Sequence, residues 1–233
     1  MLARSIIALA GALVAVCVTV SAPQAGSACG PSGYAYAGVQ STTSHGISAV
    51  LTALATPAVE SGHVAGWVGV GGPGEGPAGS DEWVQVGLNS LPGTGNTLYY
   101  EVMRPGAGAS YAEVATDVGN GRPVRVAVLE TTADPNAWRI WVDGRPVTPP
   151  IHLAGSRGAL TPMAMGESWD GGQPACNRYS YRFERVSVAQ APGGSWQAAR
   201  TAFVFQDPGY RVTRSAQASF IASATRPFLR TSQ

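Results

Sequence analysis

Hydrophobic and polar residues alternate along this chain in short runs, without the longer spacing of an amphipathic helix. The clearest run is Glu82 to Leu88, which reads EWVQVGL. Its even positions from Val84 onward are aliphatic, whereas its odd positions carry Trp83, Gln85 and a glycine. Because successive side chains of a strand point to opposite faces, this pattern predicts one core face and one exposed face that bears Gln85.

Comparable runs recur along most of the chain, bounded by Gly, Pro, Asn or Asp. About ten short strands separated by turn residues predict an all-β fold, either a sandwich or a barrel. The strands are expected at Tyr34–Gln40, Gly46–Leu54, Val64–Val70, Glu82–Leu88, Thr97–Met103, Ala112–Val118, Val124–Thr131, Trp138–Val142, Met163–Trp169 and Tyr179–Ala189.

Two turn dipeptides predict specific hairpins. Asp143-Gly144 follows the run 138–142, and Asn120-Gly121 separates the runs 112–118 and 124–131. Both dipeptides are typical of type I′ turns, in which the two central residues need positive φ. We therefore expect each dipeptide to join two paired strands.

The first 28 residues have the composition of a secretory signal. Arg4 precedes an apolar run from Ser5 to Val20, and small residues suited to cleavage follow between Ala22 and Ala28. A permanent membrane helix is the alternative, but no basic cluster follows the run. The sequence predicts an exported, extracellular protein with no membrane attachment after cleavage.

Residues 29–190 are expected to form the sandwich domain, and residues 191–233 a C-terminal appendage or tail. Gly193-Gly194 interrupts the strand pattern at this boundary, although Phe203–Phe205 and Tyr210–Val212 are still strand-like. The appendage is expected to pack on the sandwich and to end in a loose tail.

Charge excludes one class of partner. Charged residues make up 12% of the chain, the formal net charge is +1, and every basic residue other than histidine is arginine. Nucleic acids and anionic membrane surfaces are bound through clustered basic residues, which are missing here. We expect no nucleic-acid partner and a monomer.

Three cysteines are present, and Cys17 lies in the predicted signal. In an oxidising compartment, Cys29 and Cys176 are expected to form a disulfide rather than remain free thiols. The three histidines have no metal-ligand spacing, so neither a metal nor another cofactor is expected.

Polar and aromatic residues recur at alternate strand positions, as at Arg139 and Trp141 or at Glu167 and Trp169. If these faces line one concave sheet, they form a patch that suits an extended polar ligand, either a polysaccharide or a polypeptide. Each residue has an alternative structural role, as core, ion-pair member or strand-edge partner. The patch would comprise Trp83, Gln85, Glu101, Arg139, Trp141, Glu167 and Trp169.

Five segments in order, GWVGVGG, EWVQVGL, YYEVMRP, GESW and YRFERV, resemble the eqolisin or glutamic-peptidase family. The resemblance covers Val64 to Val188. It implies a concanavalin A-like jelly-roll sandwich of two curved antiparallel sheets. By position, the catalytic residues of the family fall on Gln85 and Glu167, with the other residues of the patch binding substrate.

The resemblance implies an acid endopeptidase. A protonated Glu167 would activate the substrate carbonyl, a water would attack, and Gln85 would orient that water and stabilise the oxyanion. Two alternatives stay open: a non-catalytic carbohydrate- or peptide-binding module on the same face, and a structural protein of the cell envelope.

Overall fold

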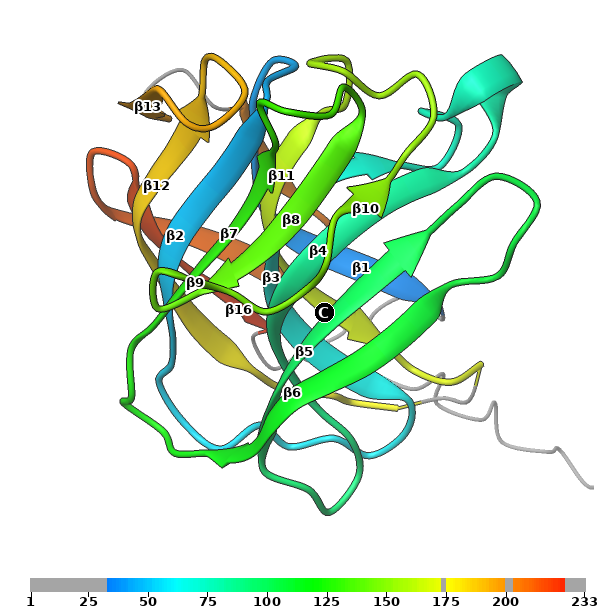
Figure 1. Ribbon diagram of the computed structural model, residues 1–233. Coiled ribbons are helices and arrows are strands. Elements are labelled where there is room, and N and C mark those ends of the chain that lie inside the picture. The colour runs from blue at the N-terminus through cyan, green and yellow to red at the C-terminus, as the bar shows by residue number, and fades with distance from the viewer. Residues whose placement is uncertain (1–32, 173–174, 200–202, 225–233) are drawn as a thin grey trace, which may run out of the picture.

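Two antiparallel β-sheets pack face to face in the computed structural model, which describes residues 33–172, 175–199 and 203–224 (Figure 1). Apart from the short 3-10 turn η1 (Pro77–Gly79), no helix occurs among these residues. The predicted all-β sandwich is confirmed, and the sandwich rather than the barrel is the form that it takes.

Sheet A is the seven-stranded sheet, in the order β14-β1-β11-β3-β4-β5-β6. Its strands are β1 (Tyr34–Gln40), β3 (His63–Gly72), β4 (Glu82–Ser90), β5 (Asn96–Met103), β6 (Ser110–Val118), β11 (Pro162–Trp169) and β14 (Phe203–Gln206).

Sheet B has nine strands, seven of them in the order β10-β8-β7-β2-β12-β16-β15, with β13 beside β12 and β9 beside β8. They are β2 (Gly46–Ala53), β7 (Val124–Glu130), β8 (Ala137–Val142), β9 (Arg145–Pro146), β10 (Ile151–His152), β12 (Ser180–Ala189), β13 (Trp196–Ala198), β15 (Tyr210–Ala216) and β16 (Ser219–Ala224).

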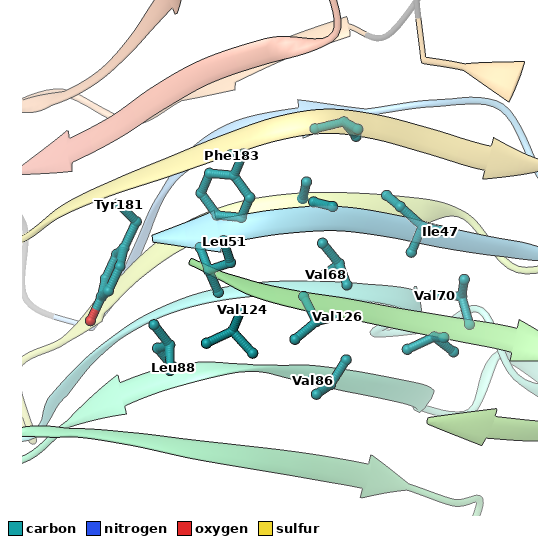
Figure 2. Packing of buried hydrophobic residues seen from close by; sticks show 14 of the residues in the cluster. Ile47, Leu51, Val68, Val70, Val86, Leu88, Val124, Val126, Tyr181 and Phe183 are labelled. Carbon is teal, nitrogen blue, oxygen red and sulfur yellow. The ribbon is translucent and has the colours of Figure 1, made fainter. Parts of the chain in front are cut away.

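The core lies between the sheets and is made by the aliphatic positions of each alternating strand. Val84, Val86 and Leu88 of β4 are fully buried, as the sequence pattern predicts. Figure 2 shows Val86 and Leu88 facing residues of sheet B such as Val126. Full burial of one such side chain stabilises the fold by about 1.5–3 kcal/mol. Burial of the aliphatic positions therefore determines that the alternate positions of each strand point outward.

One predicted hairpin is confirmed and the other is wrong. Asp143 and Gly144 have φ values of 48° and 79° and connect the paired strands β8 and β9. Strands β6 and β7 do not pair, because β6 is the edge of sheet A and β7 lies in sheet B. The chain leaves the sheet through positive φ at Asp117 and Gly121, so the segment around Asn120 is a crossover between layers.

The described residues between 191 and 224 contribute strands to both sheets instead of forming an appendage. β14 pairs with β1 at the edge of sheet A, and β16 pairs with β12 in sheet B. The ring of Phe220 stacks on that of Phe183 with centroids 4.7 Å apart and is buried with it. Residue 190 is therefore no boundary in the described fold.

The predicted signal at residues 1–28 lies outside the described residues, as does Cys29. The Cys29–Cys176 disulfide consequently stays a prediction. Within the described ranges, no helix is long and apolar enough to span a membrane.

Candidate functional site

The face of sheet A that points away from sheet B contains a cavity of about 650 Å³, called the cleft below. Seven aromatic side chains line it, together with three glutamates and one histidine, and no described arginine is among its lining residues. The aromatic residues are Tyr34, Tyr36, Trp67, Trp83, Tyr99, Tyr111 and Phe205.

Strand register determines which side chains lie next to one another on the floor of the cleft. Gly69 of β3 pairs with Met163 on one side and with Gln85 on the other. Gln85 in turn pairs with Glu101 of β5. Directly opposed residues of an antiparallel pair have Cβ atoms about 4.5–5.5 Å apart, so Gln85 and Glu101 are immediate neighbours.

Glu167 lies farther along the sheet. Glu167 pairs with Ala65 of β3, whereas Gln85 pairs with Gly69 of the same strand. The two pairing positions are four residues apart along β3. At about 3.3 Å per residue, Glu167 is displaced from Gln85 by about 13 Å along the strands and by about 10 Å across them. This register does not bring the two predicted catalytic side chains onto one water, and the β11 residue level with Gln85 is Met163.

The carboxylate of Glu167 is held by two donors. Its Oε1 lies 2.8 Å from His63 Nε2, and its Oε2 accepts a hydrogen bond of 3.0 Å from Trp67 Nε1. Glu167 is 6% exposed, and Trp67 is equally buried. Two hydrogen bonds to one buried carboxylate fix its orientation, so Glu167 organises the end of the cleft around Trp67 and His63.

Trp169 lies at this same end. Its ring stacks on Tyr34 with centroids 5.9 Å apart, and it lies 5.5 Å from the ring of His63. Tyr34 and His63 line the cleft, whereas Trp169 contacts both rings and is not among the lining residues. Trp169 therefore shapes the cleft through its neighbours.

Glu101 and Gln85 have separate partners. Trp83 Nε1 donates to Glu101 Oε1 at 2.9 Å, and Gln85 Nε2 donates to the hydroxyl of Tyr99 at 3.1 Å. Burial raises the pKa of Glu101; the bond from Trp83 opposes this, the charge of Glu167 adds to it, and His63 opposes it. Burial likewise raises the pKa of Tyr99 well above its usual value, so its hydroxyl stays neutral.

Gly69 shapes the floor between Gln85 and Met163. A Cβ atom at Gly69 would lie 2.8 Å from Gln85 Cβ, closer than such atoms approach. The absence of a side chain at Gly69 thus leaves room for the side chain of Gln85 on the floor of the cleft.

Arg139 and Trp141 do not belong to the cleft. Both are on β8 of sheet B, where they alternate with Trp138 and Ile140, which are fully buried in the core. Trp141 lines a second hollow, on the outward face of sheet B. The expected single patch is wrong for these two residues because alternation identifies the face of a strand and not its sheet.

Sequence reasoning missed several cleft residues, among them Trp67, Tyr99 and His63. The signal was available for Tyr99, which alternates onto the same face as Glu101 in YYE, and for Trp67 in GWVGVGG. His63 gave no such signal, since its role depends on the pairing of β3 with β11. Among the described residues, no group of three or more His, Cys, Asp or Glu side chains is arranged to hold a metal ion.

No protein-family model matches the chain, and no curated protein matches it in sequence. Solved structures of similar fold include scytalidoglutamic peptidase with a transition state analog inhibitor, at 14% identity and a TM-score of 0.56. They also include SCP-B, a member of the eqolisin family of peptidases, in complex with the tripeptide Ala-Ile-His, at 14% identity and a TM-score of 0.53.

Each comparison covers 84% of this chain and 98% of the other. The resemblance to eqolisins is therefore confirmed for the fold, that of a two-sheet sandwich. At this level of identity, the likeness shows the fold alone.

Proposed function

We propose that this protein binds an extended polypeptide segment in the cleft of sheet A. The observation that carries the proposal is a cavity lined by seven aromatic side chains together with amide and carboxyl groups. Aromatic faces suit the side chains of a peptide, while Gln85 and Asn89 suit its backbone groups. A volume of about 650 Å³ is within the range of ligand-binding cavities.

The charge of the cleft favours one kind of peptide. Glu101, Glu113 and Glu167 line the cleft without any described arginine. Acidic peptides meet like charges there, whereas basic side chains meet opposite ones. The ligand is a neutral or basic segment.

Proteins of the same fold support a peptide over a sugar. One such structure contains a peptide-based transition state analog, and SCP-B contains the tripeptide Ala-Ile-His. This support is an analogy between folds, so the polysaccharide alternative is an arm of the test.

Binding is tested by titrating the full chain with three peptides of equal length and neutral, basic or acidic side chains. We expect the acidic peptide to bind most weakly, because it meets three carboxyl groups. Trp83→Ala should weaken binding at least about tenfold, since it removes an aromatic wall and the donor to Glu101. Trp196→Ala, on β13 of sheet B, is the matched control and should leave binding unchanged.

Absence of binding by all three peptides would contradict the proposal. So would binding to a neutral oligosaccharide that Trp83→Ala abolishes, which favours the carbohydrate-binding alternative.

A second candidate function is hydrolysis of the bound peptide in acid. It is favoured by the direct opposition of Gln85 and Glu101 and by the raised pKa of Glu101. Protonated Glu101 would donate its proton to the substrate carbonyl oxygen while water attacks the carbon, and the Gln85 amide would hydrogen-bond to that oxygen in the tetrahedral intermediate. The Glu101 carboxylate would take a proton from the attacking water and pass it to the leaving nitrogen. The C–N bond then breaks, and the protonated carboxylic acid product returns a proton to Glu101.

The sequence instead predicts Glu167 as the general acid. Variants at each glutamate distinguish Glu101 from Glu167 in this role. Peptide cleavage is measured between about pH 2 and pH 5, across the titration of a carboxyl group. Glu101→Gln should reduce turnover at least about a hundredfold while peptide binding persists. Asp134→Asn, which removes an exposed carboxyl group before β8, is the control.

Loss of turnover in Glu167→Gln, with Glu101→Gln still active, would instead favour the Gln85 and Glu167 dyad. If the unmodified protein binds peptide and cleaves none at any pH, hydrolysis is contradicted and binding alone remains.

A further inference from the structure

The outward face of sheet B holds a separate hollow of about 400 Å³, called the groove below. Its floor is a row of small side chains on consecutive strands: Ala127 of β7, Ser48 of β2 and Ser187 of β12. Trp141 of β8 pairs with Ala127 at one end of this row, and Trp196 of β13 lies beyond β12 at the other. The row of small residues thus lies between two tryptophans, and Val50 and Leu129 also line the groove.

The length of the groove follows from the strand order. From β8 to β13 there are four strand spacings, or about 19 Å at 4.8 Å each. Gly194 leaves room for the indole of Trp196, because a Cβ atom at position 194 would lie 2.7 Å from Trp196 Nε1. A ligand that touches both tryptophans is therefore an extended chain and not a single small ring.

The groove has a charge opposite to that of the cleft. Arg125 and Arg185 line it with exposed side chains, and no described Asp or Glu does. The acidic groups nearby are engaged, since Glu184 pairs with Arg182 at 3.3 Å and Asp143 accepts the backbone N–H of Arg125. The two guanidinium groups are available to bind anionic groups of a ligand.

We propose that the groove binds an acidic polysaccharide. The indole faces of Trp141 and Trp196 stack on sugar rings, and the two arginines bind carboxylate or sulfate groups. The Ser48 hydroxyl faces the sugar hydroxyls, as does the Ser187 oxygen, whose proton is donated to the backbone carbonyl of Arg185. Two tryptophans with serines between them suit stacked sugar rings better than the side chains of an acidic peptide. Two arginines in a chain of net charge +1 are too few for the backbone of a nucleic acid.

The proposal is independent of peptide binding in the cleft, and the test uses the full chain. Calorimetric titration compares four ligands of similar length: an oligogalacturonate, a sulfated glucan oligomer, a neutral glucan oligomer and a single-stranded oligonucleotide. We expect binding to one or both acidic sugars, at least about tenfold tighter than to the neutral sugar, and weaker as salt rises. The first two arms distinguish carboxylate from sulfate.

Variants locate the binding. Arg125→Ala and Arg185→Ala should each weaken binding about tenfold, as should Trp196→Ala, whose exposed side chain leaves the fold intact. Arg122→Ala removes the same charge from the crossover before β7 and should have no effect. A thermal melt confirms that each variant is folded.

Four outcomes overturn the proposal: no binding to either acidic sugar, equal binding to the neutral one, equal losses in Arg122→Ala and Arg185→Ala, or tighter binding to the oligonucleotide.

Discussion

The cleft of sheet A and the groove of sheet B are outward faces of one sandwich, yet they are built differently. In the cleft, polar groups are nearly as buried as core residues: Gln85 is 9% exposed and Glu167 6%. In the groove, Trp196 is 41% exposed, and the side chains of Arg125 and Arg185 point into solvent. Strand alternation produces both faces, but only in the cleft do neighbouring side chains cover the polar groups and fix them by hydrogen bonds.

A second small apolar cluster explains the difference. Ala65, Trp67, Tyr99 and Met165 pack together on the outward face of sheet A, separately from the main core. No cluster of this kind is described on the outward face of sheet B. Side chains of the cleft therefore contribute to the free energy of unfolding as core residues do, whereas side chains of the groove are expected to contribute little.

The largest expected effect is that of Trp67→Ala. Because this side chain is buried and hydrogen-bonded to Glu167, its loss should lower the free energy of unfolding by about 3–5 kcal/mol. Trp196→Ala should cost less than about 1 kcal/mol. Urea unfolding of both variants measures the contrast, and equal losses would remove the distinction between cleft and groove.

Glu167→Leu should cost about 1–3 kcal/mol, because it leaves the buried indole N–H of Trp67 without an acceptor. Glu167→Gln keeps an oxygen acceptor and should cost less. Thermal unfolding at neutral pH compares the two. If both variants were as stable as the unmodified protein, Glu167 would not organise the end of the cleft.

Glu101 makes the stability of the cleft dependent on pH. Burial raises the pKa of Glu101 in the folded state above its value of about 4.3 in the unfolded chain. As the pH rises through this range, the unfolded chain loses the proton of Glu101 before the folded protein does. The free energy of unfolding therefore falls as the pH rises. Glu101→Gln removes this loss. We expect the stability of the variant relative to the unmodified protein to increase between about pH 3 and pH 7, as measured by melting temperature.

A relative stability that does not change with pH, or changes in the opposite direction, would contradict the raised pKa of Glu101. Arg145→Ala, beyond the cleft on β9, serves as the variant with no expected pH effect.

The smallest effect is expected for Arg125→Ala. An exposed arginine without a described ion-pair partner should change the free energy of unfolding by no more than about 0.5 kcal/mol. Urea unfolding checks this value. A loss above about 1 kcal/mol would show that the groove is built into the fold as the cleft is.

The sequence allowed most strands and their inward faces to be predicted, because alternation is a local property. Val84, Val86 and Leu88 illustrate this, as does the turn at Asp143-Gly144. Which sheet a strand joins is not local, and the crossover near Asn120 sends β7 and β8 to the other layer. Arg139 and Trp141 were therefore correctly predicted to share one face of their strand, but that strand was assigned to the wrong sheet.

The site was predicted in part for the same reason. Gln85 and Glu101 were both proposed, and both line the cleft. Their direct opposition, and the displacement of Glu167 by four residues, depend on registers between strands far apart in sequence. A family motif indicates which residues are present, whereas register determines which of them can touch one ligand atom.

The pairing of β14 with β1 has a consequence for how the chain folds. Ala37 is the register partner of Gln206, so the first and last strands of sheet A come from opposite ends of the sequence. Contacts of such long sequence separation form late and slow the folding of β proteins. A ribosome-bound chain that ends near residue 190 lacks this strand, and sheet A acquires its outer edge only after residues 203–206 have been synthesised.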